Sequence, residues 1–148
     1  MMRSESEPSR LDTRFGAFDL DPRDIVEFPD GLPGYEECRQ FVLVTSPTLA
    51  PLQCLHSVGD HVASFLVTDP GLVCPEFVRT LASADRDRLQ ATEDTPLLWL
   101  SILTVDADGA MHANLRAPVI INAERMVGSQ VIPQHSAYPV RGALALAS

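Results

Sequence analysis

The chain has 148 residues, a formal net charge of −9, and three cysteines and four histidines without the spacing of metal ligands. This length predicts one domain that buries its own core, and the negative charge disfavours direct contact with nucleic acid. The longest strongly apolar stretch, residues 96–105, is far shorter than the roughly 20 residues of a membrane helix, and the polar start resembles no secretory signal.

Short β-like segments separated by turn residues fill the first half of the chain. Residues 1–11 are rich in Ser, Glu and Pro and lack periodicity, which predicts a mobile N-terminal tail. Enrichment in β-branched and aromatic residues predicts strands at residues 14–20, 25–28, 40–45, 52–56 and 62–68. Proline and glycine pairs near residues 29–31 and 69–71 predict tight turns between them.

The second half continues this pattern with little helix. Residues 73–81 fit a strand or a helix equally well, and residues 83–89 predict a short helix with Ser83 as its N-cap. A long strand at 97–105, a hairpin turn at 106–109 and a strand at 110–115 follow. Residues 142–148 are small and featureless, so we expect a C-terminal tail there. Short strands with sparse helix predict a mainly β fold, an antiparallel barrel or sandwich.

The most unusual tract is Asn-Leu-Arg-Ala-Pro-Val-Ile-Ile-Asn at residues 114–122, an apolar run bracketed by two asparagines. Proline cannot donate to a sheet ladder, so Pro118 indicates a strand edge, a bulge or a strand start. Asn114 and Asn122 are expected to fix the backbone here. Asn122 is also expected to cap one helical turn over residues 123–126, before a last strand at 130–132.

Four sequence blocks resemble the FliW family of flagellar assembly factors. The tract at 112–122, followed by Gly128 and Gln-Val-Ile at 130–132, resembles the family's Asn-Leu-x-Ala-Pro signature. Phe-Pro-Asp-Gly-Leu-Pro-Gly-Tyr-Glu at 28–36 resembles the family's Phe-Pro-x-Gly-Leu-Pro-Gly-Phe-Glu. Residues 51–54 and 65–70 resemble two blocks between them. The order of the blocks makes chance agreement unlikely, although Tyr35, Cys54 and His112 depart from the usual residues.

The resemblance implies a small antiparallel β-barrel-like single domain at residues 12–141 with short helical insertions. It also implies a non-enzymatic cytoplasmic protein that binds flagellin and antagonises the translational repressor CsrA, so that flagellin level controls flagellin translation and filament assembly. No cofactor, metal, nucleic acid or membrane contact is implied.

Charge adds a hypothesis about the partner surfaces. Residues 12–37 hold eight acidic residues against two arginines, a balance of −6. Because complementary potential speeds association, this acidic region fits a basic partner such as CsrA, whereas an apolar or strand-edge surface fits flagellin. The candidate contact residues are Asp19, Asp21, Asp24, Tyr35, Glu36, Gln53, Asn114 and Asn122. The residues expected to shape the backbone are Gly31, Pro33, Gly34, Pro118 and Gly128.

No catalytic motif is present in the sequence. Gly-Ser-Gln at 128–130 lacks the spacing of a nucleophile elbow, and Gly-Leu-Pro-Gly at 31–34 lacks the lysine of a phosphate loop. The alternative function is a small-molecule-binding or hydrolytic β-barrel with a pocket in its mouth. Two or more strongly perturbed titratable groups in one deep pocket would favour that alternative.

Overall fold

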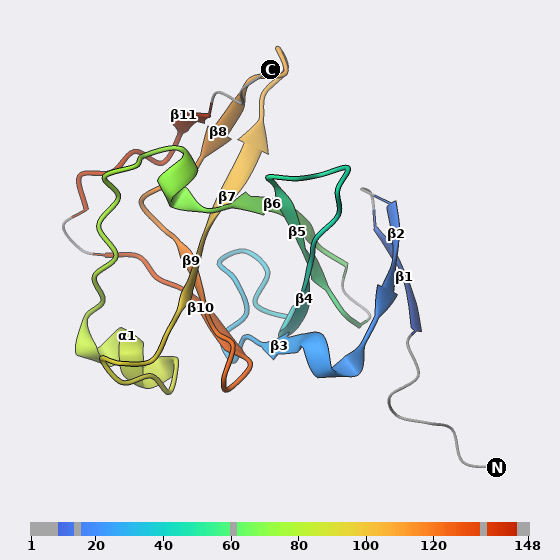
Figure 1. Cartoon of the computed structure of the whole chain (residues 1–148), viewed down its shortest axis with the longest axis horizontal. Helices are drawn as coiled ribbons and strands as arrows, with labels where there is room; N and C mark the ends of the chain where they lie inside the picture. Colours follow the sequence, from blue (N-terminus) through green and yellow to red (C-terminus); the bar gives the residue numbers. More distant parts are fainter. Residues whose placement is uncertain (1–8, 14–15, 60–61, 134–135, 145–148) are drawn as a thin grey trace.

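The computed structural model describes residues 9–13, 16–59, 62–133 and 136–144 (Figure 1). Its strands are β1 (Ser9–Thr13), β2 (Gly16–Leu20), β3 (Ile25–Glu27), β4 (Gln40–Val44), β5 (Gln53–Ser57), β6 (Ser64–Thr68), β7 (Leu98–Val105), β8 (Met111–Ala113), β9 (Val119–Asn122), β10 (Val127–Gln130) and β11 (Gly142–Leu144). The helical elements are the 3-10 turns η1 (Pro22–Asp24) and η2 (Pro70–Leu72) and the α-helix α1 (Ser83–Arg88). No helix in this described part of the chain is long and apolar enough to cross a membrane.

Seven strands form a closed barrel in the order β7-β6-β5-β4-β3-β10-β9, and β9 pairs back onto β7. The neighbours are antiparallel except for β3 and β10, which run parallel at Glu27 and Val127. β8 and β11 extend the sheet from the far half of β7, and β1 and β2 form a separate hairpin beside the barrel (Figure 1). The prediction of a mainly β, barrel-like domain is confirmed.

Two apolar clusters stabilise this arrangement. The first includes Phe28, Phe41, Leu55 and Leu100, which come from one face of the barrel strands. The second lies on the opposite face, where Trp99 of β7 packs with residues of the long segment between η2 and β7. Because both faces of the central part of β7 are covered, its apolar residues occur at successive positions and not only at alternating ones.

Gly128 makes room for the first cluster. The Phe28 ring packs so closely on this glycine that a Cβ there would lie 2.5 Å from the ring. Phe28 is fully buried and meets Phe41 edge-on at 5.0 Å between ring centroids. Glycine therefore fits this position because any side chain would collide with the Phe28 ring.

Both predicted tails include residues that form strands, so their boundaries are wrong. Residues 9–11 belong to β1, which pairs with β2, and residues 142–144 form β11, which pairs with β8. These strands are short and weakly patterned, so their pairing depends on a partner strand that local composition does not reveal. Residues 1–8 and 145–148 lie outside the described residues.

Three local predictions also need correction. Ala82, not Ser83, is the N-cap of α1, and Ser83 is its first helical residue. Residues 123–126 form a hairpin turn between β9 and β10 rather than a helical turn, with Met126 at φ 51°. Because of this turn, the strand predicted at 130–132 lies earlier in the chain, at Val127–Gln130. Residues 73–81, left open between strand and helix, form neither.

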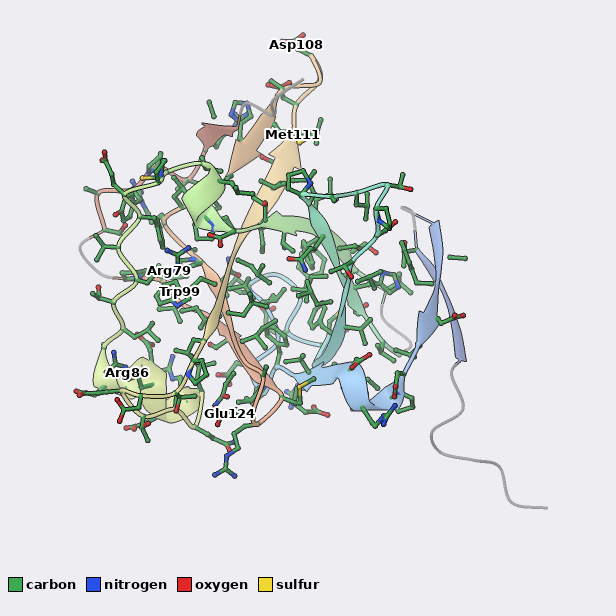
Figure 2. All side chains as sticks on the ribbon, in the orientation of Figure 1. Arg79, Arg86, Trp99, Asp108, Met111 and Glu124 are labelled. Carbon is green, nitrogen blue, oxygen red and sulfur yellow. The ribbon has the colours of Figure 1, made fainter. Side chains whose placement is uncertain are left out.

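The turn at residues 106–109 is confirmed, with Gly109 at φ 83°. The Asp106 carboxylate accepts hydrogen bonds from the Asp108 and Ala110 amides and lies 3.1 Å from His112 Nε2. The hydrogen bond with His112, followed by that from Ala110, lowers the pKa of Asp106. Figure 2 shows this hairpin tip, marked by Asp108, at the opposite end of the molecule from Arg86 of α1.

Candidate functional site

The Gly-Leu-Pro-Gly-Tyr-Glu turn presents Tyr35 at the barrel surface. Leu32 and Tyr35 form an antiparallel bridge, with the Tyr35 amide donating to the Leu32 carbonyl at 2.6 Å. The Glu36 carboxylate accepts from the Gly34 amide at 2.6 Å, so Glu36 stabilises the turn. Tyr35 stays 46% exposed while its ring meets Phe65 edge-on at 5.1 Å. Tyr35 is thus held rigidly beside β6.

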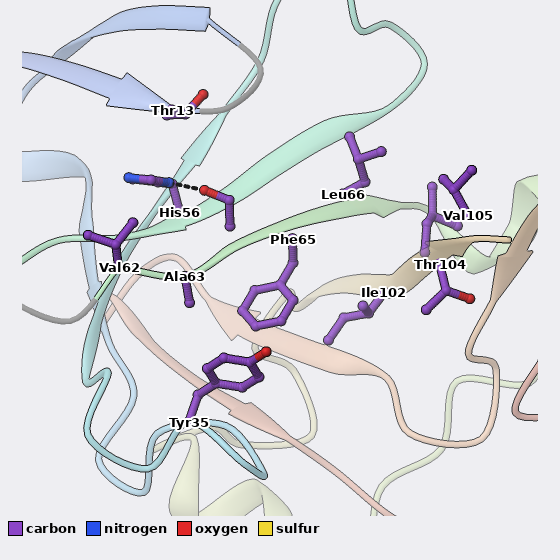
Figure 3. Close-up of a pocket in the computed structure, with 12 residues that line it drawn as sticks. Thr13, Tyr35, His56, Val62, Ala63, Phe65, Leu66, Ile102, Thr104 and Val105 are labelled. Atoms are coloured by element: carbon purple, nitrogen blue, oxygen red, sulfur yellow. Dashed lines mark hydrogen bonds between the residues drawn. The ribbon is translucent and has the colours of Figure 1, made fainter. Parts of the chain in front are cut away.

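Tyr35 borders an open groove of about 770 Å³ (Figure 3). The groove lies between the N-terminal half of β6 and the C-terminal half of β7. Its lining consists of Thr13, Tyr35, His56, Val62, Ala63, Ser64, Phe65, Leu66, Ile102, Leu103, Thr104 and Val105. None of these side chains is a carboxylate, an arginine or a cysteine, so the groove is a mostly apolar surface.

One polar pair lies at the edge of the groove. His56 Nδ1 is hydrogen-bonded to Ser64 Oγ, as drawn in Figure 3. His56 is buried, and the loss of hydration lowers the pKa of its imidazole. A serine–histidine pair is also part of hydrolytic triads, but the lining residues offer no carboxylate to orient this histidine. The pair is better suited to fixing β5 against β6.

The buried imidazole predicts a pH dependence of stability. Because the folded state binds the His56 proton more weakly than the unfolded state, the free energy of unfolding should fall as the pH drops below about 6.5. The His56→Gln variant should show a smaller fall in urea denaturation between about pH 7.5 and pH 5. The His112→Gln variant keeps His56 and should retain the fall. Equal pH profiles for wild type and His56→Gln would contradict this assignment.

The three aspartates expected to meet a basic partner surround one small hollow. Asp19, Asp21 and Asp24 line a space of about 260 Å³ together with residues 42–45 of β4 and its C-terminal end. Asp19 and Asp24 are exposed. Asp21 instead caps η1 and holds Arg23, whose Nη2 lies 2.7 Å from its carboxylate. This hydrogen bond lowers the pKa of Asp21. Asp19 and Asp24 therefore supply most of the negative charge of this acidic surface.

Asn114 shapes the backbone before Pro118. Its Oδ1 accepts hydrogen bonds from the Arg116 and Ala117 amides, both at 3.1 Å. Pro118 comes immediately before β9, so of the strand edge, bulge or strand start predicted there, the structure shows a strand start. The two hydrogen bonds hold the turn before Pro118, and a partner contact of Asn114 stays a prediction.

Asn122 is fully buried and joins two distant segments. Its Nδ2 donates to the Leu89 carbonyl at 2.8 Å and, more weakly, to the Gln90 carbonyl at 3.4 Å. Its Oδ1 accepts from the Glu124 amide at 3.1 Å. The side chain thus ties the end of α1 to the β9–β10 turn rather than fixing the backbone around Pro118.

Gln53 lies apart from these sites. It is the first residue of β5, half-buried, and borders a shallow hollow of about 360 Å³ formed mainly by residues 45–52. The structure therefore distributes the candidate residues over three surfaces. Tyr35 lies at the groove, the aspartates at the acidic surface and Gln53 at the β4–β5 loop.

Comparison with known proteins is consistent with this architecture. The profile of the FliW protein family matches residues 10–144. The chain belongs to the FliW family. The flagellar assembly factor FliW of Bdellovibrio bacteriovorus is 32% identical over 130 residues, which cover 87% of this chain and 74% of the relative. That of Pseudothermotoga lettingae is 33% identical over 131 residues, covering 87% and 83%. A crystal structure of the flagellar assembly factor FliW superposes with a TM-score of 0.81 at 30% identity, covering 90% of this chain and 94% of the other.

Sequence reasoning missed most of the groove in this FliW-family chain. Val62 and Val105 are 73% and 52% exposed, although each was predicted only as part of a strand. The sequence does not show whether a β-branched residue in a strand is exposed, because its exposure depends on whether another strand packs or pairs beside it. Among the described residues no group of histidine, cysteine or acidic side chains could hold a metal ion.

Proposed function

We propose that this FliW-family chain is a non-enzymatic cytoplasmic factor that binds flagellin and antagonises the translational repressor CsrA. Membership of a family whose relatives are named flagellar assembly factors is the observation that carries this proposal. Binding of flagellin would release CsrA, so the concentration of free flagellin would control flagellin translation. Such a circuit requires that each partner lower the affinity for the other by the same factor.

The surface chemistry supports two different kinds of contact. The groove beside Tyr35 is uncharged and mostly apolar, as a binding site for a protein segment would be. The acidic surface at Asp19 and Asp24 fits a basic partner, and RNA-binding repressors of the CsrA type are basic. The alternative of a hydrolytic or small-molecule-binding barrel gains little support, because the groove is open and its lining holds no carboxylate.

Calorimetry with purified flagellin and CsrA of the same bacterium tests the proposal. We expect saturable binding of each partner, and we expect added flagellin to weaken CsrA binding. The reciprocal titration, with CsrA added first, should weaken flagellin binding by the same factor. Failure of flagellin to bind, or independent binding of both partners, would refute the proposed circuit.

Charge reversal should separate the acidic surface from the rest of the molecule. With Asp19→Lys and Asp24→Lys together, we expect association with CsrA to slow about tenfold at low salt, because the attractive potential becomes repulsive. Dissociation should change less, and added salt should narrow the difference from wild type. Stopped-flow measurements over a salt series provide both rates.

A matched control exists on the other side of the barrel. Asp87 in α1 and Asp94 after it are exposed, and α1 lies across the barrel from β2 in Figure 1. Asp87→Lys with Asp94→Lys changes the net charge equally but leaves the acidic surface intact. Equal slowing in both double variants would mean that overall charge, not this surface, controls association.

A further inference from the structure

The groove beside Tyr35 exists because β6 and β7 separate. Their pairing stops at two residue pairs, Val67 with Ile102 and Thr68 with Ser101. Beyond this point the N-terminal half of β6 stays paired with β5, while the C-terminal half of β7 pairs with β8 on its other edge. In the part of the chain that the structure describes, no residue pair joins residues 103–105 of β7 to another strand on the groove side, and the Leu103 amide marks the end of the pairing with β6.

The backbone groups of Val105 and the carbonyl of Leu103 face this opening. The Ile102 carbonyl accepts from the Asn114 amide at 2.9 Å, and the Asp106 amide donates to Ala110 at 3.0 Å, so both residues point toward β8 and its flanking residues. In an antiparallel ladder alternate residues direct their N–H and C=O groups to opposite edges. The N–H and C=O groups of Leu103 and Val105 therefore point away from β8. The Ile102–Val67 pair places the Leu103 N–H opposite the Leu66 carbonyl, so the Leu103 carbonyl and both backbone groups of Val105 form the open edge at the groove.

The groove has room for an additional strand. An extended residue in a sheet occupies about 160 Å³, which is the product of the rise per residue, the distance between neighbouring strands and the distance between stacked sheets. A groove of about 770 Å³ thus corresponds to about five extended residues.

Apolar side chains lie on both faces of such a strand. Phe65 and Ile102 pack with the first apolar cluster, whereas Leu66 and Leu103 belong with the second, so the groove is apolar on both sides of the sheet. Tyr35 and Phe65 lie close together on the first of these faces, as Figure 3 shows. A segment added here would need apolar residues at successive positions, as in strands covered on both faces.

We infer that the groove receives an extended, uncharged and largely apolar segment of flagellin, which pairs as an added strand with the open edge of β7. This inference rests on the proposed binding of flagellin. Charge assigns the occupant of the groove. The chain has a net charge of −9, but the groove lining carries no formal charge, so the groove suits an uncharged segment. A basic partner would instead bind the acidic surface. In strand addition, main-chain hydrogen bonds provide affinity and side-chain pockets provide specificity.

Amide hydrogen exchange measured by NMR tests the pairing directly in the wild-type protein. On addition of purified flagellin, exchange at the Val105 amide should slow by about tenfold or more, because this amide would become hydrogen-bonded. The Thr104 amide points toward β8 and serves as the internal control, with a smaller change. Unchanged exchange at Val105 in the saturated complex would overturn strand addition.

Two charge insertions locate the site independently. Val62→Glu and Val105→Glu each place a carboxylate in the groove at an exposed position, so the fold should tolerate them. Each should weaken flagellin binding at least about tenfold, because a charge would have to be buried without a partner. Ile132→Glu is the control, since Ile132 is 62% exposed and lies outside the groove. CsrA binding should be retained in all three variants.

The outcomes distinguish the inference from the function on which it rests. If wild type binds no flagellin, the proposed function fails. If wild type binds flagellin but the groove variants bind it as tightly as Ile132→Glu does, the function stands and the groove assignment fails. Loss of flagellin binding in the groove variants, with CsrA binding and melting temperature retained, supports both.

Discussion

Replacement of Gly31 by alanine is expected to cost more than about 3 kcal/mol of unfolding free energy, and it should be among the most damaging single changes in the chain. Gly31 has φ 64°, and a Cβ there would lie 2.7 Å from both the Glu36 Cα and the Tyr35 carbonyl oxygen. These atoms belong to the backbone of a tight turn, so they cannot move aside cheaply. Urea denaturation of the purified variant measures the loss.

Gly34 in the same turn separates conformational strain from steric overlap. Its φ is 84°, but a Cβ there would meet nothing within 4 Å. Gly34→Ala should therefore cost only the about 1–2 kcal/mol of placing an L-residue in the left-handed region. If both variants lost the same stability, the close approach at Gly31 would not be what requires glycine.

The second large effect is expected for Asn122→Ala, at about 2–3 kcal/mol of unfolding free energy and several degrees of melting temperature. The substitution leaves the Leu89 carbonyl and the Glu124 amide without their side-chain partner at a fully buried position. It also removes the hydrogen bond to the Gln90 carbonyl. Gln90 follows α1 and has φ 54°, in the strained left-handed region. Thermal and urea denaturation report the loss.

Asn114→Ala is the matched comparison, because the chain contains only these two asparagines. Asn114 accepts a hydrogen bond from the Arg116 amide, which lies near solvent, so water can replace the lost acceptor. We therefore expect Asn114→Ala to lower the free energy of unfolding by about 1 kcal/mol. In both variants any weakening of partner binding should accompany a lower melting temperature. Weakened binding at wild-type melting temperature would instead assign these asparagines to a partner interface.

The sequence predicted the architecture where pattern and turn chemistry act locally. The strands around Phe41, Leu55 and Leu100 follow from β-branched and aromatic runs between turns, and the Asp106–Gly109 reversal follows from Asp and Gly preferences. Strands β1 and β11 were missed because they are short and depend on distant partners. The shift of the last strand has a local cause, since Met126 adopts a positive φ that its residue type does not announce.

The candidate site was less predictable than the fold. Tyr35 could be singled out because glycine and proline surround it, and the aspartates because their charges cluster in sequence. The groove itself depends on where β7 leaves β6 for β8, which is a property of pairings between remote segments. Asn122 illustrates the same limit, because its partners lie 32 and 33 residues away.

The parallel contact between Glu27 and Val127 has a consequence for how the chain reaches its native state. β3 belongs to the first part of the chain to be synthesised, yet its neighbour β10 follows about one hundred residues later. On a ribosome, the early hairpins from β3 to β6 would keep the edge of β6 unpaired until β7 emerges and the edge of β3 unpaired until β10 emerges. Such remote pairings slow folding and prolong the exposure of strand edges. The barrel should therefore form late and cooperatively, and a nascent chain truncated before Val127 should be a substrate for chaperones.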